Sequence, residues 1–185
     1  MGGVLAFEVA RQLEQAGEAV DLLVLLDAPF AVPADYVPAD PELAARFVSD
    51  AMDSLALDSA DSPGPDVTSV AEQLSWLADR LGGGAAVAAQ LERRFRLFAA
   101  HSRMLAGYQP TAGGTQAAAL IVSAARSPNA AMAWQWQGLL PSTATVVAEV
   151  ESDHYSFLRS PLVTEVGATI RKWHGGWLEG RTDGS

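Results

Sequence analysis

Hydrophobic residues recur every three to four positions between Val4 and Leu13, which predicts an amphipathic helix at the start of the chain. Gly17 interrupts this pattern, and the following segment from Ala19 to Leu26 (AVDLLVLL) is almost continuously apolar. A short apolar run of this kind is typical of a strand that is covered on both faces of a parallel sheet. The chain therefore opens with a helix, a tight turn and a buried strand.

A passage rich in Pro and Asp follows this strand and continues neither a strand nor a helix. Helical patterns then appear three times before the next strand, over residues 41–57, 69–81 and 87–105. Asp40 and Pro41 suit the N-cap and the first position of the first of these helices. Long insertions between two strands are usually functional, so we expect residues 33–108 to form a helical lid. The alternative is a plain helical subdomain.

Further strand and helix patterns follow the insertion. We expect strands at 116–124 and 143–150, a short helix at 129–140 and a longer helix at 162–177. Strands that alternate with helices imply a parallel sheet with helices on both faces. The sequence thus predicts an α/β fold in one domain over residues 1–180, with a disordered tail over residues 181–185.

Composition narrows the classes of function. The chain has 185 residues, of which 49% are hydrophobic, and this suffices for one domain with a substantial core. Its net charge of −10 argues against binding to nucleic acid or to anionic membranes, because both need clustered Lys and Arg. The absence of cysteine excludes disulfides, thiolate zinc sites and a cysteine nucleophile. No membrane-spanning apolar run or signal segment is visible, and we expect a cytoplasmic location.

Two candidate catalytic residues stand where predicted strands end. Asp27 directly follows the strand that ends at Leu26, and His154 comes a few residues after the strand that ends at Val150. Catalytic groups in open parallel sheets gather at the carboxyl ends of the strands. Taken singly, Asp27 is more often a turn residue and His154 an ordinary loop residue. Together they follow the chain order of a serine hydrolase triad, in which a serine comes first.

Two adjacent glycines stand at the start of the first predicted helix. Gly2 and Gly3 predict a flexible turn that other backbone can approach very closely. In α/β-hydrolases, a Gly-x-Ser-x-Gly turn between a strand and a helix carries the nucleophilic serine. If Met1 is the second x and Gly2 the last glycine, the serine belongs immediately before residue 1. The other interpretation is an ordinary helix start.

Four stretches of the chain carry a resemblance to a known family. They are residues 1–10 with Leu13, residues 25–29 around Asp27, residues 108–110, and residues 152–158 around His154. In this order and spacing they resemble the thioesterase domains of polyketide synthases and non-ribosomal peptide synthetases, which are α/β-hydrolases with a helical lid. The chain is similar to roughly the C-terminal three-quarters of such a domain. Ser152 departs from the family pattern, which has glycine before its Asp-His pair.

The resemblance implies a serine thioesterase with Asp27 as the acid, His154 as the base and the nucleophilic serine immediately before Met1. The backbone N–H of Met1 would form part of the oxyanion hole, next to the elbow glycines Gly2 and Gly3. An intact domain would hydrolyse or cyclise an acyl or peptidyl thioester presented on the phosphopantetheine arm of a carrier protein, with no other cofactor. This chain, which lacks the serine, is expected to be inactive alone.

Several alternatives bear on this interpretation. Some related enzymes carry the acid after the strand that follows the lid instead, but no Asp or Glu occurs from Pro110 to Ala148, which leaves Asp27. Two other functions are possible, a non-catalytic pseudoenzyme or module that binds acyl chains or carrier proteins, and a general lipase or esterase. His101 and His174 are expected on helix surfaces, and no spacing typical of a metal site occurs.

Overall fold

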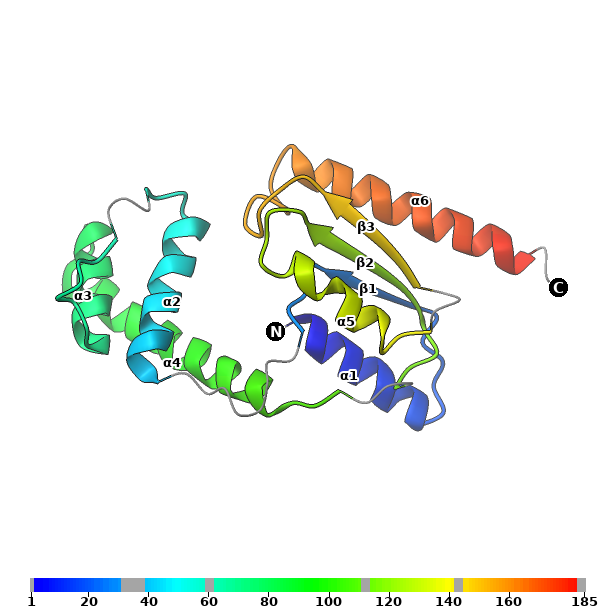
Figure 1. Cartoon of the computed structure of the whole chain (residues 1–185), viewed down its shortest axis with the longest axis horizontal. Coiled ribbons are helices and arrows are strands. Elements are labelled where there is room, and N and C mark those ends of the chain that lie inside the picture. The colour runs from blue at the N-terminus through cyan, green and yellow to red at the C-terminus, as the bar shows by residue number, and fades with distance from the viewer. Residues whose placement is uncertain (1, 31–38, 59–61, 111–113, 142–144, 183–185) are drawn as a thin grey trace. The chain divides into compact units, whose positions relative to one another are not determined.

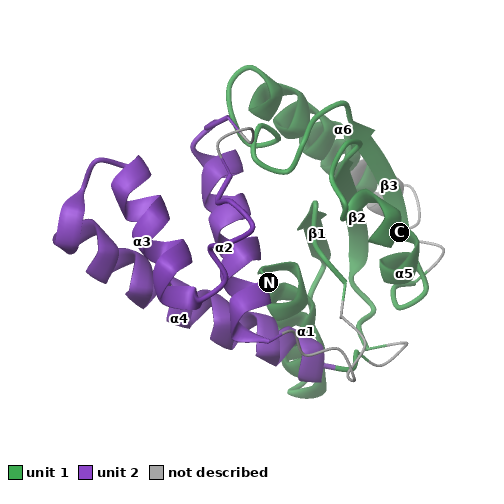
Figure 2. Cartoon of the chain, turned by 60° about the vertical axis from the view of Figure 1, so that its left-hand side comes forward, with its two compact units in different colours: residues 1–31, 109–185 green, residues 32–108 purple. Residues whose placement is uncertain are grey.

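The structure is a computed structural model that describes residues 2–30, 39–58, 62–110, 114–141 and 145–182 (Figure 1). The chain divides into two compact units, residues 1–31 with 109–185 and residues 32–108 (Figure 2). The first unit contains α1 (Gly2–Gln15), β1 (Leu22–Leu26), β2 (Ala118–Ala124), η2 (Ala130–Met132), α5 (Ala133–Gln137), β3 (Thr145–Val150) and α6 (Leu162–Thr182). The second contains α2 (Asp40–Ser54), α3 (Val70–Arg80) and α4 (Gly84–Gly107). Within the described ranges, no helix is long and apolar enough to cross a membrane.

Three parallel strands form the sheet of the first unit as far as the chain is described, in the order β1-β2-β3 (Figure 1). Leu120 of β2 lies opposite Val24 of β1 and Val146 of β3. Every residue of β2 is buried, which accounts for its nearly unbroken apolar sequence. The α/β class predicted from the alternation of strands and helices is confirmed. Because the strands are parallel, their carboxyl ends meet at one edge of the sheet.

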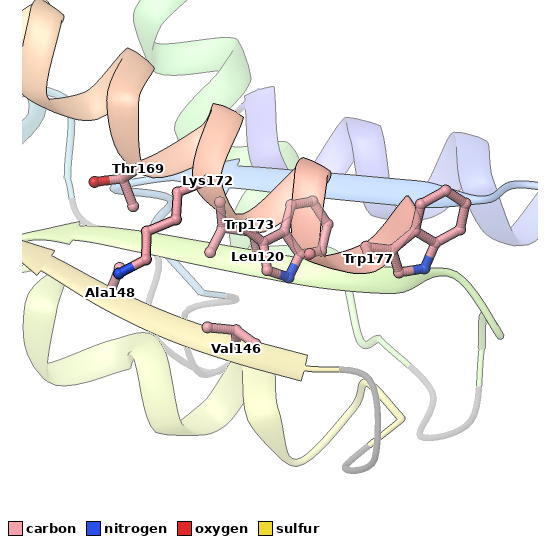
Figure 3. A pocket seen from close by; sticks show the side chains of 8 residues that line it. Leu120, Val146, Ala148, Thr169, Lys172, Trp173 and Trp177 are labelled. Atoms are coloured by element: carbon pink, nitrogen blue, oxygen red, sulfur yellow. The ribbon is translucent and has the colours of Figure 1, made fainter. Parts of the chain in front are cut away.

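Helix α6 covers one face of this sheet (Figure 1). Leu120 and Val122 of the central strand belong to the same buried cluster as Val166 of α6, and Trp173 packs against that cluster. A groove of about 510 Å³ stays open between the second half of α6 and strands β2 and β3 (Figure 3). The rings of Trp173 and Trp177 line it, so this part of the apolar helix face is only partly covered.

Helices α1 and α5 lie on the other face (Figure 1). Phe7 of α1 and Trp136 of α5 are fully buried, and their ring centroids are 5.6 Å apart. Phe30, which follows β1, meets Trp136 in an edge-on contact with ring centroids 5.1 Å apart. Three aromatic side chains therefore join the first helix, the segment after β1 and the helix after β2.

The second unit has a hydrophobic core of its own, to which α2, α3 and α4 all contribute. Val48, Leu77 and Phe95 are among its buried residues. Ser69 is the N-cap of α3 and forms a capping box with Glu72, so the predicted start of this helix is confirmed. A separate core of this kind allows residues 32–108 to be held together by contacts among themselves.

The ends of several elements differ from the predictions. The predicted cap at Asp40 is wrong, because Ala39 is the N-cap of α2 and Asp40 is already helical. Helix α6 continues to Thr182, so the tail predicted from residue 181 begins too early. The prediction was based on apolar periodicity, and the helical hydrogen bonds extend beyond the last residue of that pattern. The remaining tail residues, 183–185, and the predicted strand residues 143 and 144 lie outside the described residues.

Candidate active site at the strand ends

Asp27 stands directly after β1 and is 2% exposed. Its N–H donates to the carbonyl oxygen of Val122 (2.7 Å), and this bond is the last between the two strands at that end. Its backbone is left-handed, with a φ of 41°, a conformation that Asp tolerates better than most residues. The carboxylate reaches the end of β2, where the N–H of Ala124 donates to Oδ1 (3.1 Å).

His154 follows β3 and is brought against Asp27 by the parallel arrangement of the strands. The distance between Nδ1 of His154 and Oδ2 of Asp27 is 2.6 Å. The Asp27 side chain is 1% exposed, whereas that of His154 is 46% exposed. A buried carboxylate at Nδ1 favours the tautomer that carries its proton on Nδ1, while nearly half of the imidazole side chain remains accessible.

Hydrogen bonds keep Asp27 ionised in spite of its burial. Burial by itself raises the pKa of this carboxyl group. Hydrogen bonds from His154, from the Ser127 hydroxyl and from the Ala124 N–H, with the charge of the His154 ring, outweigh this and bring the pKa of Asp27 below its ordinary value. The group is therefore a carboxylate at neutral pH and can stabilise a positive charge on the imidazole.

The loop that carries His154 is shaped by the carboxylate of Asp153. Its Oδ1 accepts hydrogen bonds from the N–H groups of Tyr155 (2.9 Å) and Ser156 (2.8 Å), and its Oδ2 accepts one from the Ser156 hydroxyl. These bonds, chiefly the two from Ser156, lower the pKa of Asp153 to about 2. An ionised Asp153 thus holds the turn on either side of His154 at all but strongly acidic pH.

Ser152, where the resembled family has glycine, is completely buried. Its hydroxyl donates to the carbonyl oxygen of Val150 (3.4 Å), and its own carbonyl oxygen accepts a hydrogen bond from the N–H of Arg126 (2.9 Å). The hydroxyl group of Ser152 is therefore accommodated within the loop.

Comparison with known families identifies the chain. A profile described as Thioesterase domain matches residues 1–173. The chain belongs to this thioesterase family. A comparison with curated proteins finds no match.

Solved structures similar to this thioesterase share its fold. Holo-AB3403, a four-domain nonribosomal peptide synthetase bound to AMP and glycine, matches with a TM-score of 0.72 and 22% identity over 92% of this chain and 14% of its own. Human thioesterase 2 matches with a TM-score of 0.56 and 12% identity, over 95% of this chain and 69% of its own. The Vlm2 thioesterase domain bound with a dodecadepsipeptide matches with a TM-score of 0.53 and 21% identity, over 92% of this chain and 62% of its own. The predicted family and α/β-hydrolase fold are confirmed.

The glycines at the start of this thioesterase differ from the prediction in one respect. Met1 lies outside the described residues, so its role in the oxyanion hole stays a prediction. Gly2 and Gly3 belong to α1 and do not form a turn ahead of it. A Cβ on Gly3 would lie 2.4 Å from Cβ of Ala28, whereas nothing lies within 4 Å of a Cβ on Gly2. Gly3 is therefore required for the close approach of α1 to the segment that follows Asp27.

Replacement of Gly3 by Ala is expected to lower the free energy of unfolding by about 1–3 kcal/mol, because the Cβ of Ala28 is fixed to its backbone and moves aside only with it. Gly2→Ala is the matched control, and alanine there should be neutral or slightly stabilising as the better helix former. Urea unfolding compares the two variants. Equal losses of unfolding free energy in the two variants, or no loss in Gly3→Ala, would contradict the close approach of Gly3 to Ala28.

Residues in the segment after β2 also hold Asp27, and they were not predicted from the sequence. Nδ2 of Asn129 donates to the backbone oxygen of Asp27 (3.0 Å), and the hydroxyl of Ser127 is hydrogen-bonded to its carboxyl group. Nε1 of Trp136 donates to the carbonyl oxygen of Ala28 (3.1 Å). The position of Ser127 and Asn129 just after a buried strand could have indicated them, by the same rule that indicated Asp27.

The other two histidines lie on helices. His174 is exposed on α6 and stacks on Trp177, with ring centroids 6.3 Å apart, as expected of a residue on a helix surface. His101 lies on α4 in the second unit and is partly buried. Among the described residues, no group of three His, Cys, Asp or Glu could hold a metal ion.

Proposed function

We propose that this domain releases acyl or peptidyl chains by cleaving the thioester that joins them to a carrier protein. The observation that carries the proposal is the 2.6 Å contact between Nδ1 of His154 and the buried carboxylate of Asp27. Such a pair is the acid and base of a serine hydrolase, in which the carboxylate orients the imidazole and stabilises its protonated form. Membership of the thioesterase family supports a thioester as the bond that is cleaved.

In the proposed reaction, His154 moves the protons and Asp27 holds it in place. With Nδ1–H donating to Asp27, Nε2 is the nitrogen that takes the proton from a serine hydroxyl as its oxygen attacks the thioester carbonyl. The tetrahedral intermediate then loses the thiolate, which receives the proton from the imidazolium. Water, or a hydroxyl or amine of the acyl chain, attacks the acyl-serine next. The now neutral His154 takes the proton of this nucleophile and passes it to the leaving serine oxygen.

The nucleophile in this proposal is a serine immediately before Met1. The close approach of Gly3 to Ala28 supports this placement, because it brings the N-terminal end of α1 next to Asp27. A serine just ahead of α1 would lie at the same edge of the sheet as His154, where the carboxyl ends of the strands meet. The backbone N–H of Met1 would then donate to the developing oxyanion.

We further propose that a carrier domain presents the thioester on its phosphopantetheine arm, the one cofactor that this mechanism requires. The similarity to part of a four-domain nonribosomal peptide synthetase supports a carrier as the partner. Residues 33–108 are proposed to act as the lid over the acyl chain. The separate core of the second unit supports this role, because a lid has to keep its own structure when it moves.

Turnover of an acyl N-acetylcysteamine thioester tests the proposed activity. We expect thiol release from the chain when it carries its native preceding residues, and a loss on the order of 10⁶-fold when the serine before Met1 is replaced by Ala. The 185-residue chain by itself is expected to release no thiol. A thiol-reactive dye measures the product.

Three outcomes would contradict parts of the proposal. Binding of an acyl carrier protein without thiol release from the extended chain would favour a non-catalytic binding module. Equal turnover of carrier-bound thioesters and free oxygen esters would favour a general esterase. A gene that encodes no Gly-x-Ser directly before Met1 would make the proposed nucleophile wrong.

A further inference from the structure

We propose that Asn129 is a positioning residue whose side-chain amide, together with the Ser127 hydroxyl, holds the Asp27 carboxylate in the orientation that His154 needs. The catalytic consequence rests on the function proposed above, while the geometry stands on contacts between described residues. Asn129 and Ser127 come from the segment between β2 and α5. Ser127 is 7% exposed, so its hydroxyl acts away from bulk solvent.

The backbone around Asp27 needs such support because it leaves the sheet in a left-handed conformation, which is unfavourable for most residues with a Cβ. Its N–H remains bonded to Val122, but its carbonyl oxygen accepts a hydrogen bond from Nδ2 of Asn129 (3.0 Å). The next carbonyl oxygen, that of Ala28, accepts one from Nε1 of Trp136 (3.1 Å). Two successive carbonyl groups after β1 are thus bound by side chains that follow β2.

The two carboxylate oxygens of Asp27 have different partners. Oδ1 accepts a hydrogen bond from the N–H of Ala124 (3.1 Å), while Oδ2 lies 2.6 Å from Nδ1 of His154. Nδ2 of Asn129 lies 3.4 Å from the same Oδ2. Asn129 therefore contacts both the main chain of Asp27 and the oxygen that meets the imidazole. Rotation of the carboxylate away from His154 would break these contacts together.

The Ser127 hydroxyl group contacts both Asn129 and Asp27. Its Oγ accepts a hydrogen bond from the N–H of Asn129 (3.1 Å), and its hydroxyl is hydrogen-bonded to the Asp27 carboxyl group. One short segment thus supplies a hydroxyl and an amide as donors to a single buried carboxylate. An acid at position 129 would instead place a second negative charge there and raise the pKa of Asp27, so the amide suits this role.

Nitrogen-15 NMR of the His154 ring in the full chain tests the role of Asn129. In the wild type we expect slow exchange of the Nδ1 proton with water, because it is held against a buried carboxylate. Asn129→Ala should accelerate this exchange. In the domain with its serine, the same variant should lower kcat on the order of 100-fold with KM unchanged, as expected for a misplaced catalytic group.

Two further variants separate positioning from packing. Asn129→Asp keeps the shape but replaces the donor by a carboxylate, which should raise the pKa of His154 and move the acidic limb of the kcat/KM profile to higher pH. Gln137→Ala removes an exposed amide at the end of α5 and should behave like the wild type in every measurement.

The proposal would be overturned if, in both Asn129→Ala and Asn129→Asp, the Nδ1 proton of His154 exchanged with water at the wild-type rate and the pKa of His154 were unchanged. Failure of both variants to fold would also overturn it, because Asn129 would then serve the fold. If the NMR results are as expected but even the wild-type domain with its serine releases no thiol, the proposed function fails and the positioning role stands.

Discussion

Replacement of Asp27 by Asn is expected to lower kcat for the proposed thioester hydrolysis by a factor on the order of 10⁴ in a chain extended to include the proposed serine. Asparagine keeps the size of the side chain, but an amide N–H turned toward Nδ1 favours the tautomer with its proton on Nε2. That nitrogen then has no lone pair to accept the serine proton. The neutral amide also fails to stabilise the imidazolium, and steady-state kinetics on an acyl thioester measures the combined loss.

The pKa of His154 is expected to fall in the same variant. The pKa of Asp27 lies below its ordinary value, so its carboxylate is charged throughout the range in which histidine titrates and favours the protonated ring. An NMR titration of the 185-residue chain measures this without any need for the serine. Asp79→Asn, on the exposed side of α3, is the control and should change neither kcat nor this pKa. A wild-type rate in Asp27→Asn would remove the carboxylate from the mechanism.

Replacement of Trp136 by Ala is expected to lower the free energy of unfolding by about 3–5 kcal/mol. Trp136 is fully buried and packs against the rings of Phe7 and Phe30. Its removal would leave a cavity between α1, α5 and the segment after β1, and would leave the carbonyl oxygen of Ala28 without its donor. Urea unfolding followed by circular dichroism measures the loss.

Trp134 provides the matched control, since it lies two positions earlier on the same helix and is 67% exposed. Trp134→Ala should change the free energy of unfolding by no more than about 0.5 kcal/mol. Trp136→Phe keeps much of the ring packing but not the indole N–H, and a loss of about 1–3 kcal/mol is expected from the unpaired carbonyl group of Ala28. Similar effects of Trp134→Ala and Trp136→Ala would contradict the contacts described for Trp136.

The order of the elements was predictable because periodicity is a local property. The apolar run of β2 reflects burial on both faces, and the capping box of Ser69 and Glu72 satisfies helix N–H groups within a single turn. The predictions were wrong by one or a few residues at the ends of elements, as at Asp40, which is helical although its residue type favours the cap.

The pairing of Asp27 with His154 was predictable for a similar reason. In a parallel sheet every carboxyl end points to the same edge, so residues that follow its strands are brought to that edge whatever their separation in the chain. Asp27 after β1 and His154 a few residues after β3 both lie at this edge, with β2 between their strands, and the loop after β3 places Nδ1 of His154 2.6 Å from Oδ2 of Asp27. Asn129 lies at this edge too, but an amide has no titratable group to draw attention to it, and its role follows only from its contacts with Asp27.

The sequence by itself determined the class of the fold, the candidate residues at the strand ends and the thioesterase family, because these depend on residue type, spacing and order. Only the tertiary structure decided between residues of the same type. Gly3, unlike Gly2, lies against Ala28, and Trp136, unlike Trp134, is buried. Such differences arise from packing between segments far apart in the chain, and local periodicity carries no information about that packing.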